Sequence, residues 1–375
     1  MCDLGLLDLR HAELEREPQS LLIWGPFEPL RTGAALQTSE IARGFAENGW
    51  DVRVLSFRGC ECPQDVPIQL DQLPIDYLHQ VAQPHGYWAQ LSRLARPYLE
   101  SARSERRTLL LAKESLVWPL EIACPGLIES AIVLLTGSPA WEATTGQLKE
   151  SETTRLIDLW RRAAQTIVGS RHMLGAIGPN LANVVVHKFG IDLRPLMLVP
   201  RRARSQDKHR FVHVSNGLEL KRTARVLELF ATCHGRIPGS ELLVVGRHGV
   251  ARGDGVQCVG CVPPPELYAL MRSATALIVM SAYEVGPRVA YEAMALECPV
   301  IAGHGLGLDE LQVTQGPCTL QIDMRDANAL TRAIAMLNNP QYCEELQRRA
   351  SSLLRQRNLR TTLAVLARSI RTLAQ

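Results

Sequence analysis

Two glutamates, Glu284 and Glu292, lie eight positions apart within residues 281–295, which read SAYEVGPRVAYEAMA. The apolar run Ala276–Met280 before them predicts a strand, and the residues after Pro287 predict a helix. Glu284 then lies in the turn and Glu292 about one helical turn into the helix, so both carboxylates can face one cleft. A carboxylate accepts two hydrogen bonds side by side, which suits the vicinal hydroxyls of a ribose or a hexose. Such a pair could bind a sugar, but two glutamates at this spacing are common in helices, so the prediction depends on the whole motif around them.

The same turn offers backbone groups to an anion. The residues at the expected helix N-terminus are Gly286, Pro287, Arg288 and Val289. A helix N-terminus is a ready site for a pyrophosphate, because its N–H groups and its dipole favour negative charge. A further strand over residues 299–302 then leads into a glycine-rich turn. His304 lies in that turn, and we expect it beside the same pocket.

This order of strand, turn, helix, strand and glycine-rich turn resembles the retaining glycosyltransferases of group 1, also called family 4. The resemblance covers about residues 20–340 and is strongest after residue 210. It implies an α/β protein of GT-B architecture, with two Rossmann-like domains facing each other across a cleft. It also implies transfer of a hexose-type sugar from a nucleoside-diphosphate donor with retention of configuration. By the resemblance, Glu284 contacts the donor sugar and Glu292 the donor ribose.

The family also uses an arginine and, five residues on, a lysine to hold the donor diphosphate. The matching positions are Asn216 and Lys221, after the predicted strand Phe211–Val214. Lys221 keeps the cation that offsets charge on the departing phosphate, while Asn216 lacks one. Arg247, after another predicted strand, either supplies the missing charge or is a surface loop residue. The chain has no Asp-x-Asp pair, so we expect a metal-independent enzyme with no cofactor except a uridine- or guanosine-type nucleotide sugar as co-substrate.

The first domain carries weaker matches. Gly33, in the loop after the predicted strand Leu21–Trp24, matches a glycine that the family keeps near the diphosphate. The family often places a histidine after the strand that corresponds to residues 131–136, where this chain has Ser138. Ser138 could donate a hydrogen bond there or could simply cap a helix. We take it, with Glu284 and Lys221, as a catalytic candidate.

Short apolar runs alternate with helical patterns in both halves of the chain, which predicts parallel sheets covered by helices. No Gly-x-Gly-x-x-Gly follows the first strand, so the pattern does not indicate a dinucleotide-binding enzyme. The segment 193–209 is rich in proline and arginine and is the expected linker. The predicted organisation is an arm over 1–19, an acceptor-side domain over 20–195, a nucleotide-sugar-binding domain over 196–355 and a C-terminal helix over 356–375.

Composition limits the class of protein. The 375 residues are 46% hydrophobic and 21% charged, as in soluble globular proteins. No apolar run is long enough to span a bilayer, and the acidic, polar start is unlike a signal peptide. Ten scattered cysteines indicate reduced thiols and a cytoplasmic protein. Cys258 and Cys261 have metal-ligand spacing, but we expect Cys258 to be buried in a strand as a small hydrophobe.

The acceptor cannot be chosen from the sequence; it could be a small molecule, a lipid-linked glycan or a polymer. Five arginines form a basic segment over residues 93–107 in the acceptor-side domain. This segment is either a solvated helix face or a peripheral contact with an anionic lipid surface or a nucleic acid. Because Asn216 and Val285 depart from the family pattern, a catalytically silent GT-B partner or sugar-nucleotide-binding subunit is the alternative. An epimerase or phosphorylase is a third possibility that no residue favours.

Overall fold

The computed structural model describes residues 19–30, 32–61, 63–77, 85–137, 149–171, 174, 183–200, 209–237, 239–247, 253–305, 307–308 and 310–374. The chain forms two compact units. Among the described residues, the first unit comprises 19–189 together with 359–374, and the second unit comprises Gly190–Asn358. The chain thus leaves the first unit once and returns to it for its last helix.

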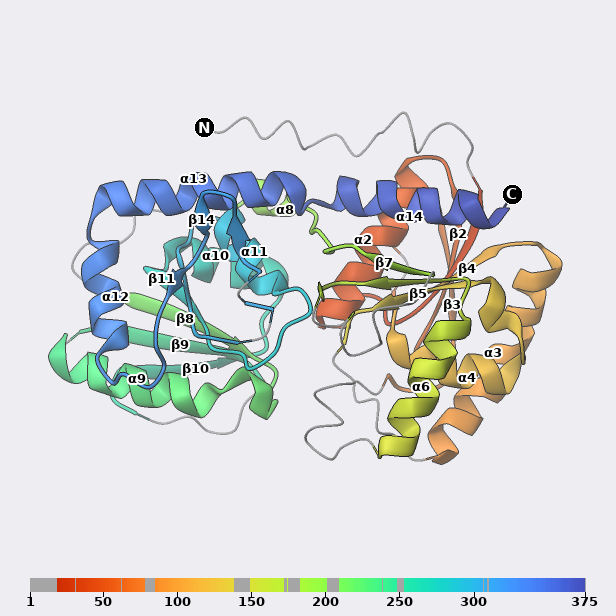
Figure 1. Ribbon diagram of the computed structural model, residues 1–375, viewed down its shortest axis with the longest axis horizontal. Coiled ribbons are helices and arrows are strands. Elements are labelled where there is room, and N and C mark those ends of the chain that lie inside the picture. The colour runs from red at the N-terminus through yellow and green to blue at the C-terminus, as the bar shows by residue number, and fades with distance from the viewer. Residues whose placement is uncertain are drawn as a thin grey trace. The chain divides into compact units, whose positions relative to one another are not determined.

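The first unit alternates strands and helices in the manner of a parallel α/β domain (Figure 1). Its elements in chain order are β1 (Ser20–Trp24), α2 (Gly33–Glu47), β2 (Asp51–Ser56), β3 (Ile68–Gln72), α3 (His85–Ser104), β4 (Thr108–Leu111), η1 (Glu114–Leu116), α4 (Val117–Ala123), η2 (Leu127–Ser130), β5 (Ala131–Leu135), α6 (Glu150–Arg162), β6 (Gln165–Val168), β7 (Val184–Val186) and, from the end of the chain, α14 (Leu359–Ala374).

Its seven strands form one parallel sheet in the order β3-β2-β1-β4-β5-β6-β7. The strand order reverses between β1 and β4, which is where such sheets usually bind ligands. Helices α2 and α14 pack together on one face: a Cβ added to Gly44 would overlap Leu363, so that glycine permits the close approach. On the other face, α4 contacts both α3 and α6 (Figure 1).

The second unit repeats this plan. Its elements are α8 (Arg194–Met197), β8 (Arg210–Ser215), η3 (Glu219–Lys221), α9 (Thr223–Arg236), β9 (Glu241–Gly246), β10 (Val256–Gly260), α10 (Pro264–Ser273), β11 (Ala276–Val279), α11 (Arg288–Ala295), β12 (Val300–Ala302), β13 (Gln312–Val313), β14 (Gly316–Pro317), β15 (Leu320–Gln321), α12 (Ala329–Leu337) and α13 (Pro340–Gln356).

Six of these strands form a parallel sheet in the order β10-β9-β8-β11-β12-β15, while β13 and β14 pair as a small antiparallel ribbon. One hydrophobic core lies between the sheet and α10, α11 and α13, and a second lies on the opposite face under α9 and α12. β8 and β11 are neighbours at the reversal of strand order. These two strands are the central ones of the sheet, and the predicted site residues follow their carboxyl ends.

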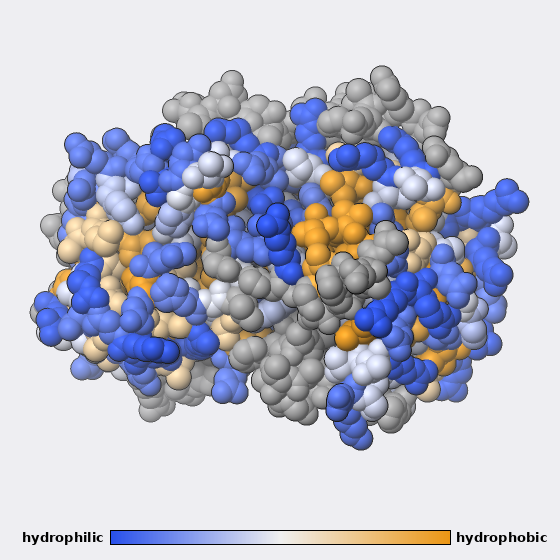
Figure 2. Space-filling view, in the orientation of Figure 1, coloured by the Kyte–Doolittle hydropathy of each residue, from blue (hydrophilic) through white to orange (hydrophobic). Residues whose placement is uncertain are grey.

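The strands predicted from apolar runs are present, most with an end shifted by one or two residues. β3, β13, β14 and β15 are not among the predicted strands, because their runs are short and partly polar, as in IQLDQ and LQ. Hydrophilic residues cover most of the visible surface, and apolar side chains show in smaller patches (Figure 2). Within the described ranges, no helix has both the length and the hydrophobicity needed to cross a membrane.

Candidate active site

An ion pair joins the loops that follow β8 and β11. Lys221 is the last residue of η3, between β8 and α9, and its Nζ donates to Glu284 Oε1 at 2.5 Å. The two side chains are only 20% and 12% exposed, so water screens the pair partly. The structure therefore brings together two of the three predicted catalytic candidates, which lie 63 residues apart in the chain.

Backbone contacts brace the loop that carries Glu284. The amide of Ala282 donates to the carbonyl oxygen of Leu220 at 2.7 Å, which fixes this loop to η3. The glycine-rich turn packs on its other side. A Cβ on Gly307 would overlap the carbonyl oxygen of Glu284, and Gly307 also has a φ of +87°. Only glycine meets both conditions, so this turn can lie directly against the Glu284 backbone.

A buried polar network supports the Lys221 side of the site. His213, on β8, is 2% exposed, and its Nδ1 lies 3.0 Å from the carbonyl oxygen of Ile278 on β11. A carbonyl only accepts, so Nδ1 carries a proton. His213 Nε2 lies 3.1 Å from Thr223 Oγ1, which in turn lies 2.9 Å from Ser215 Oγ. The network connects the two central strands to the first residue of α9 and thereby fixes the segment that carries Lys221.

Glu292 is the fifth residue of α11 and is 4% exposed. Its Oε1 accepts a hydrogen bond from Arg288 Nε at 2.8 Å, one helical turn earlier. Pro287 is the N-cap of α11, and the amide of Arg288 donates to the carbonyl oxygen of Gly286 at 2.7 Å. Val289 packs partly against the core. Glu292, the predicted ribose-binding carboxylate, is therefore buried and paired with Arg288. The amide of Arg288, one of those expected to bind an anion, is hydrogen-bonded within its own turn.

The remaining predicted donor-binding residues of this unit are more peripheral. Asn216 is exposed, and its Oδ1 accepts from the amide of Leu218 at 3.3 Å, within its own loop. Arg247 follows β9 and is exposed. The side chain of His304 is exposed, and its backbone carbonyl accepts from Arg222 Nη1 at 3.2 Å. The structure thus keeps Asn216 and Arg247 away from direct contact with the Lys221–Glu284 pair.

The expected burial of Cys258 is wrong. Cys258 is exposed, as is Cys261. β10 is the edge strand of its sheet and pairs only with β9, so one side of it remains open to solvent. Val259, which follows Cys258 in the sequence, packs against the core, as expected because successive side chains of a strand point to opposite sides.

In the first unit, Gly33 is the first residue of α2, which Thr32 caps by accepting from the amide of Ala35 at 3.1 Å. A Cβ on Gly33 would meet no described atom within 4 Å. Packing inside this unit therefore does not require glycine there, and the position is open to the approach of a ligand. Ser138 lies outside the described residues.

The sequence interpretation missed a buried ion pair at the carboxyl ends of β4 and β5. Lys113 Nζ bonds to Glu114 Oε1, and the two side chains are 5% and 0% exposed. Glu114 Oε2 accepts from the amides of Thr136 and Gly137 at 3.0 and 2.8 Å, and from Thr136 Oγ1. The sequence signal that could have revealed this pair is the position of Lys113 and Glu114 after one strand and of Thr136 and Gly137 after the neighbouring strand. The carboxylate sets the start of the segment that leads to Ser138.

Burial alone would raise the pKa of the Glu114 carboxyl. The Lys113 ammonium and the backbone amides more than compensate, and they hold the pKa below its ordinary value. Glu114 is therefore a buried carboxylate that stays ionised, and its four hydrogen-bond donors make it a fixed anchor rather than a proton donor.

The basic segment lies mainly on α3. Arg93, Arg96, Arg103 and Arg106 are exposed, while the opposite face of the helix is buried in the unit. Arg107 differs, because it forms ion pairs with acidic residues of the same unit. Four arginines therefore reach the surface of the first unit.

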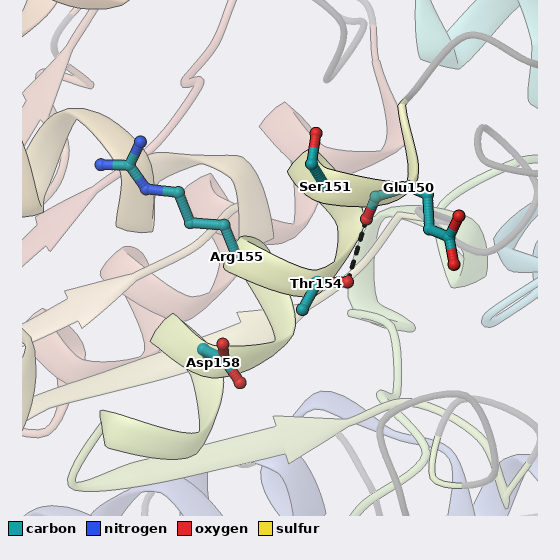
Figure 3. A pocket seen from close by; sticks show the side chains of 5 residues that line it. All are labelled: Glu150, Ser151, Thr154, Arg155 and Asp158. Atoms are coloured by element: carbon teal, nitrogen blue, oxygen red, sulfur yellow. Dashed lines mark hydrogen bonds between the residues drawn. The ribbon is translucent and has the colours of Figure 1, made fainter.

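A surface pocket lies beside α6 in the first unit (Figure 3). Its lining residues all come from that one helix: Glu150, Ser151, Thr154, Arg155 and Asp158. Thr154 Oγ1 donates to the carbonyl oxygen of Glu150 at 3.0 Å, and the Arg155 guanidinium lies 5.0 Å from the ring centroid of Trp118. A single helix face offers no convergent set of ligand-binding groups, so we do not assign a site there.

Residues 200–353 match the model of the family described as glycosyl transferases group 1. This segment contains the Lys221–Glu284 pair, Glu292 and the glycine-rich turn. No curated protein sequence matches the chain.

Several solved structures share the fold over nearly their whole length. Sucrose-phosphate synthase from Thermosynechococcus elongatus superposes with a TM-score of 0.74 at 17% identity, covering 96% of this chain and 99% of that one. HepE from Anabaena, in complex with UDP and glucose, gives 0.70 at 16% identity and covers 95% and 100%. WaaG, a glycosyltransferase involved in lipopolysaccharide biosynthesis, gives 0.66 at 15% identity and covers 94% and 99%. These likenesses confirm the predicted α/β class and GT-B fold.

Proposed function

We propose that this protein is a glycosyltransferase that moves a hexose-type sugar from a nucleoside diphosphate to an acceptor hydroxyl with retention of configuration. The observation that carries the proposal is the ion pair between Lys221 and Glu284, with the buried carboxylate of Glu292 on the following helix. All three lie in the segment that matches the group 1 glycosyltransferase model. A cation can bind the donor diphosphate, and two carboxylates can accept hydrogen bonds from the hydroxyls of the donor sugar and of the ribose.

The proposed chemistry relies on positioning and charge stabilisation. The bond between the sugar and the diphosphate breaks as the acceptor oxygen bonds to the sugar on the same face. The acceptor's proton passes to the departing phosphate, so no protein nucleophile is needed. Negative charge on the phosphate grows in the transition state, and Lys221 stabilises it there more than in the bound donor. Glu284 contacts the donor sugar and Glu292 the ribose hydroxyls.

The donor carries uridine or guanosine diphosphate in this proposal. The shared fold with HepE, which was crystallised with UDP and glucose, supports the uridine type. We further propose that the reaction needs no metal ion: the sequence has no Asp-x-Asp pair, and Lys221 would supply the positive charge that offsets the leaving group.

The acceptor side is assigned to the first unit, and the reaction to the cytoplasm. The four exposed arginines of the segment 93–107 support an anionic acceptor or an anionic lipid surface beside it. Salt dependence of transfer, but not of donor hydrolysis, would separate such an acceptor contact from a solvated helix face.

A catalytically silent GT-B partner or sugar-nucleotide-binding subunit is the second candidate, favoured by one observation. Asn216 contributes no charge and bonds within its own loop. Such a protein would bind the nucleotide sugar without turning it over.

The two candidates are separated by mass spectrometry of purified protein offered a panel of nucleotide sugars, with and without a host extract as acceptor. New glycosylated products, or nucleoside diphosphate released without acceptor, are expected for the transferase. Saturable donor binding with no product under any condition would favour the silent protein and refute catalysis.

A further inference from the structure

The backbone of Arg222 adopts the left-handed conformation, with φ 50° and ψ 40°. Arg106 and Glu297 are the other residues apart from glycine with positive φ in the described part of the chain. A Cβ makes this conformation unfavourable, so glycine is the residue expected here. Arg222 also precedes α9 as its N-cap, without a capping hydrogen bond from its side chain. Neither the turn nor the helix start therefore accounts for arginine at this position.

The side chain of Arg222 reaches a segment far along the chain. Its Nη1 donates to the carbonyl oxygen of His304 at 3.2 Å and lies 3.8 Å from Met324 Sδ. His304 lies in the glycine-rich turn after β12. Arg222 thus ties the start of α9 to that turn, across 82 residues of sequence.

The turn held by Arg222 is the one that packs on the backbone of Glu284. Cβ atoms on Gly305 and Gly307 would overlap the carbonyl oxygens of Ser281 and Glu284. The adjacent residue Lys221 meanwhile bonds to the Glu284 side chain. Two neighbouring residues therefore act on one loop: one pairs with its carboxylate, and the other fixes the turn behind its backbone.

We propose that Arg222 is a positioning residue of the donor site, whose guanidinium holds the glycine-rich turn against the loop that carries Glu284. The unfavourable backbone of Arg222 is retained because glycine, the relaxed alternative, has no side chain to make this contact. The inference rests on the proposed function for its effect on turnover. The anchoring of the turn is a property of the second unit and can be measured without substrate.

The test compares Arg222→Gly with Glu297→Gly in the full-length protein. Glu297 has φ 58° and lies after α11, so its glycine variant relieves the same kind of backbone strain without removing the contact to His304. Glu297→Gly also removes a long ion pair with Arg272, at 3.9 Å, which offsets part of the gain. We therefore expect a Tm that is unchanged or raised by up to about 4 °C, and unchanged turnover. Arg222→Gly gains the same relief but loses the hydrogen bond, so its Tm should stay within about 2 °C of wild type.

Three readouts follow for Arg222→Gly. Hydrogen exchange of a peptide spanning residues 303–308 should be about tenfold faster than in wild type and in Glu297→Gly. Donor turnover should fall about tenfold or more, because Glu284 is less well placed. Affinity for UDP or GDP without sugar, measured by calorimetry, should change by less than about twofold, because Glu292 is untouched. Arg222→Lys should keep part of the turnover, because its ammonium can still donate a hydrogen bond but lacks the planar geometry of the guanidinium.

Unchanged exchange in residues 303–308 would overturn the anchoring directly. Normal turnover in Arg222→Gly beside an active wild type would overturn its relevance to the donor site while leaving the proposed function intact. A large loss of nucleotide affinity would also overturn it, because Arg222 would then contact the ligand itself. If the wild-type protein is inactive but hydrogen exchange of residues 303–308 is faster in Arg222→Gly, the anchoring of the turn by Arg222 stands and the proposed function is refuted.

Discussion

Lys221 Nζ lies 2.5 Å from Glu284 Oε1, so the site's candidate cation is paired with its candidate sugar-binding carboxylate. The pair is only partly exposed to water. A bound donor would place its phosphate beside Lys221 and its sugar beside Glu284. The ion pair holds both side chains in place at the donor site that we propose.

The first prediction concerns the cation. Lys221→Ala should lower turnover by about 10²–10³, with a smaller loss of donor affinity, because charge on the leaving phosphate is greatest in the transition state. Lys221→Arg should restore only part of the turnover, because a planar fork cannot reproduce a compact point charge. Turnover and affinity are measured on the same preparations, with circular dichroism as the folding control. Near-normal turnover in Lys221→Ala would remove this residue from the mechanism.

The second prediction concerns the ribose carboxylate. Glu292→Ala should weaken binding of both the intact donor and the free nucleoside diphosphate, by about tenfold or more, because it removes a buried acceptor for hydroxyl groups. Arg288→Ala is the matched control, since it removes the partner at 2.8 Å but keeps the carboxylate. Calorimetry with UDP and GDP measures both. Equal affinity in wild type and Glu292→Ala would contradict the assignment.

The third prediction uses the buried pair of the first unit. Glu114→Gln leaves Lys113 charged and buried, and should lower the free energy of unfolding at pH 7 by about 3–5 kcal/mol. Folding lowers the pKa of Glu114, so its contribution is present above the unfolded-state pKa and is lost as pH falls through the folded-state value. The difference between wild type and variant should therefore shrink in acid, as followed by urea denaturation from pH 7 down to about 3.

A double variant, Lys113→Met with Glu114→Gln, serves as the control for that prediction. It removes both charges and should recover part of the lost stability. A difference between wild type and Glu114→Gln that stays constant with pH would show that Glu114 is not the ionised anchor described above.

The fourth prediction concerns metal ions. Activity should persist in EDTA, because Lys221 offsets the leaving-group charge. A modest stimulation by manganese is compatible with this, since divalent ions also bind the released diphosphate. Rates that collapse in EDTA and recover with manganese would contradict a metal-independent reaction.

Much of the second unit could be predicted from the sequence, because Glu284, Glu292 and Lys221 each follow a clear apolar strand. The role of Arg222 could not. Residue types signal left-handed backbone only where glycine, asparagine or aspartate occurs, and Arg222 and Glu297 adopt it without that signal. The exposure of Cys258 likewise depends on the lateral order of strands, which short apolar runs do not specify.

The first unit was harder to interpret. Its strands were identifiable, but the sequence analysis did not single out Lys113 and Glu114, because adjacent Lys and Glu residues are usually exposed. Their burial results from the approach of Thr136 and Gly137, which lie more than 20 residues away. Tertiary contacts of this kind are not visible in local patterns.

The most direct test of the central claim is release of nucleoside diphosphate from a panel of nucleotide sugars by purified wild-type protein and by Glu284→Gln. The variant keeps the size of the side chain and removes the charge beside Lys221. We predict release from a uridine- or guanosine-diphosphate sugar by wild type, increased by a host extract that supplies acceptor, and loss of that release in Glu284→Gln. Release that is equal in both proteins, or absent in wild type despite saturable donor binding, would contradict glycosyl transfer at this site.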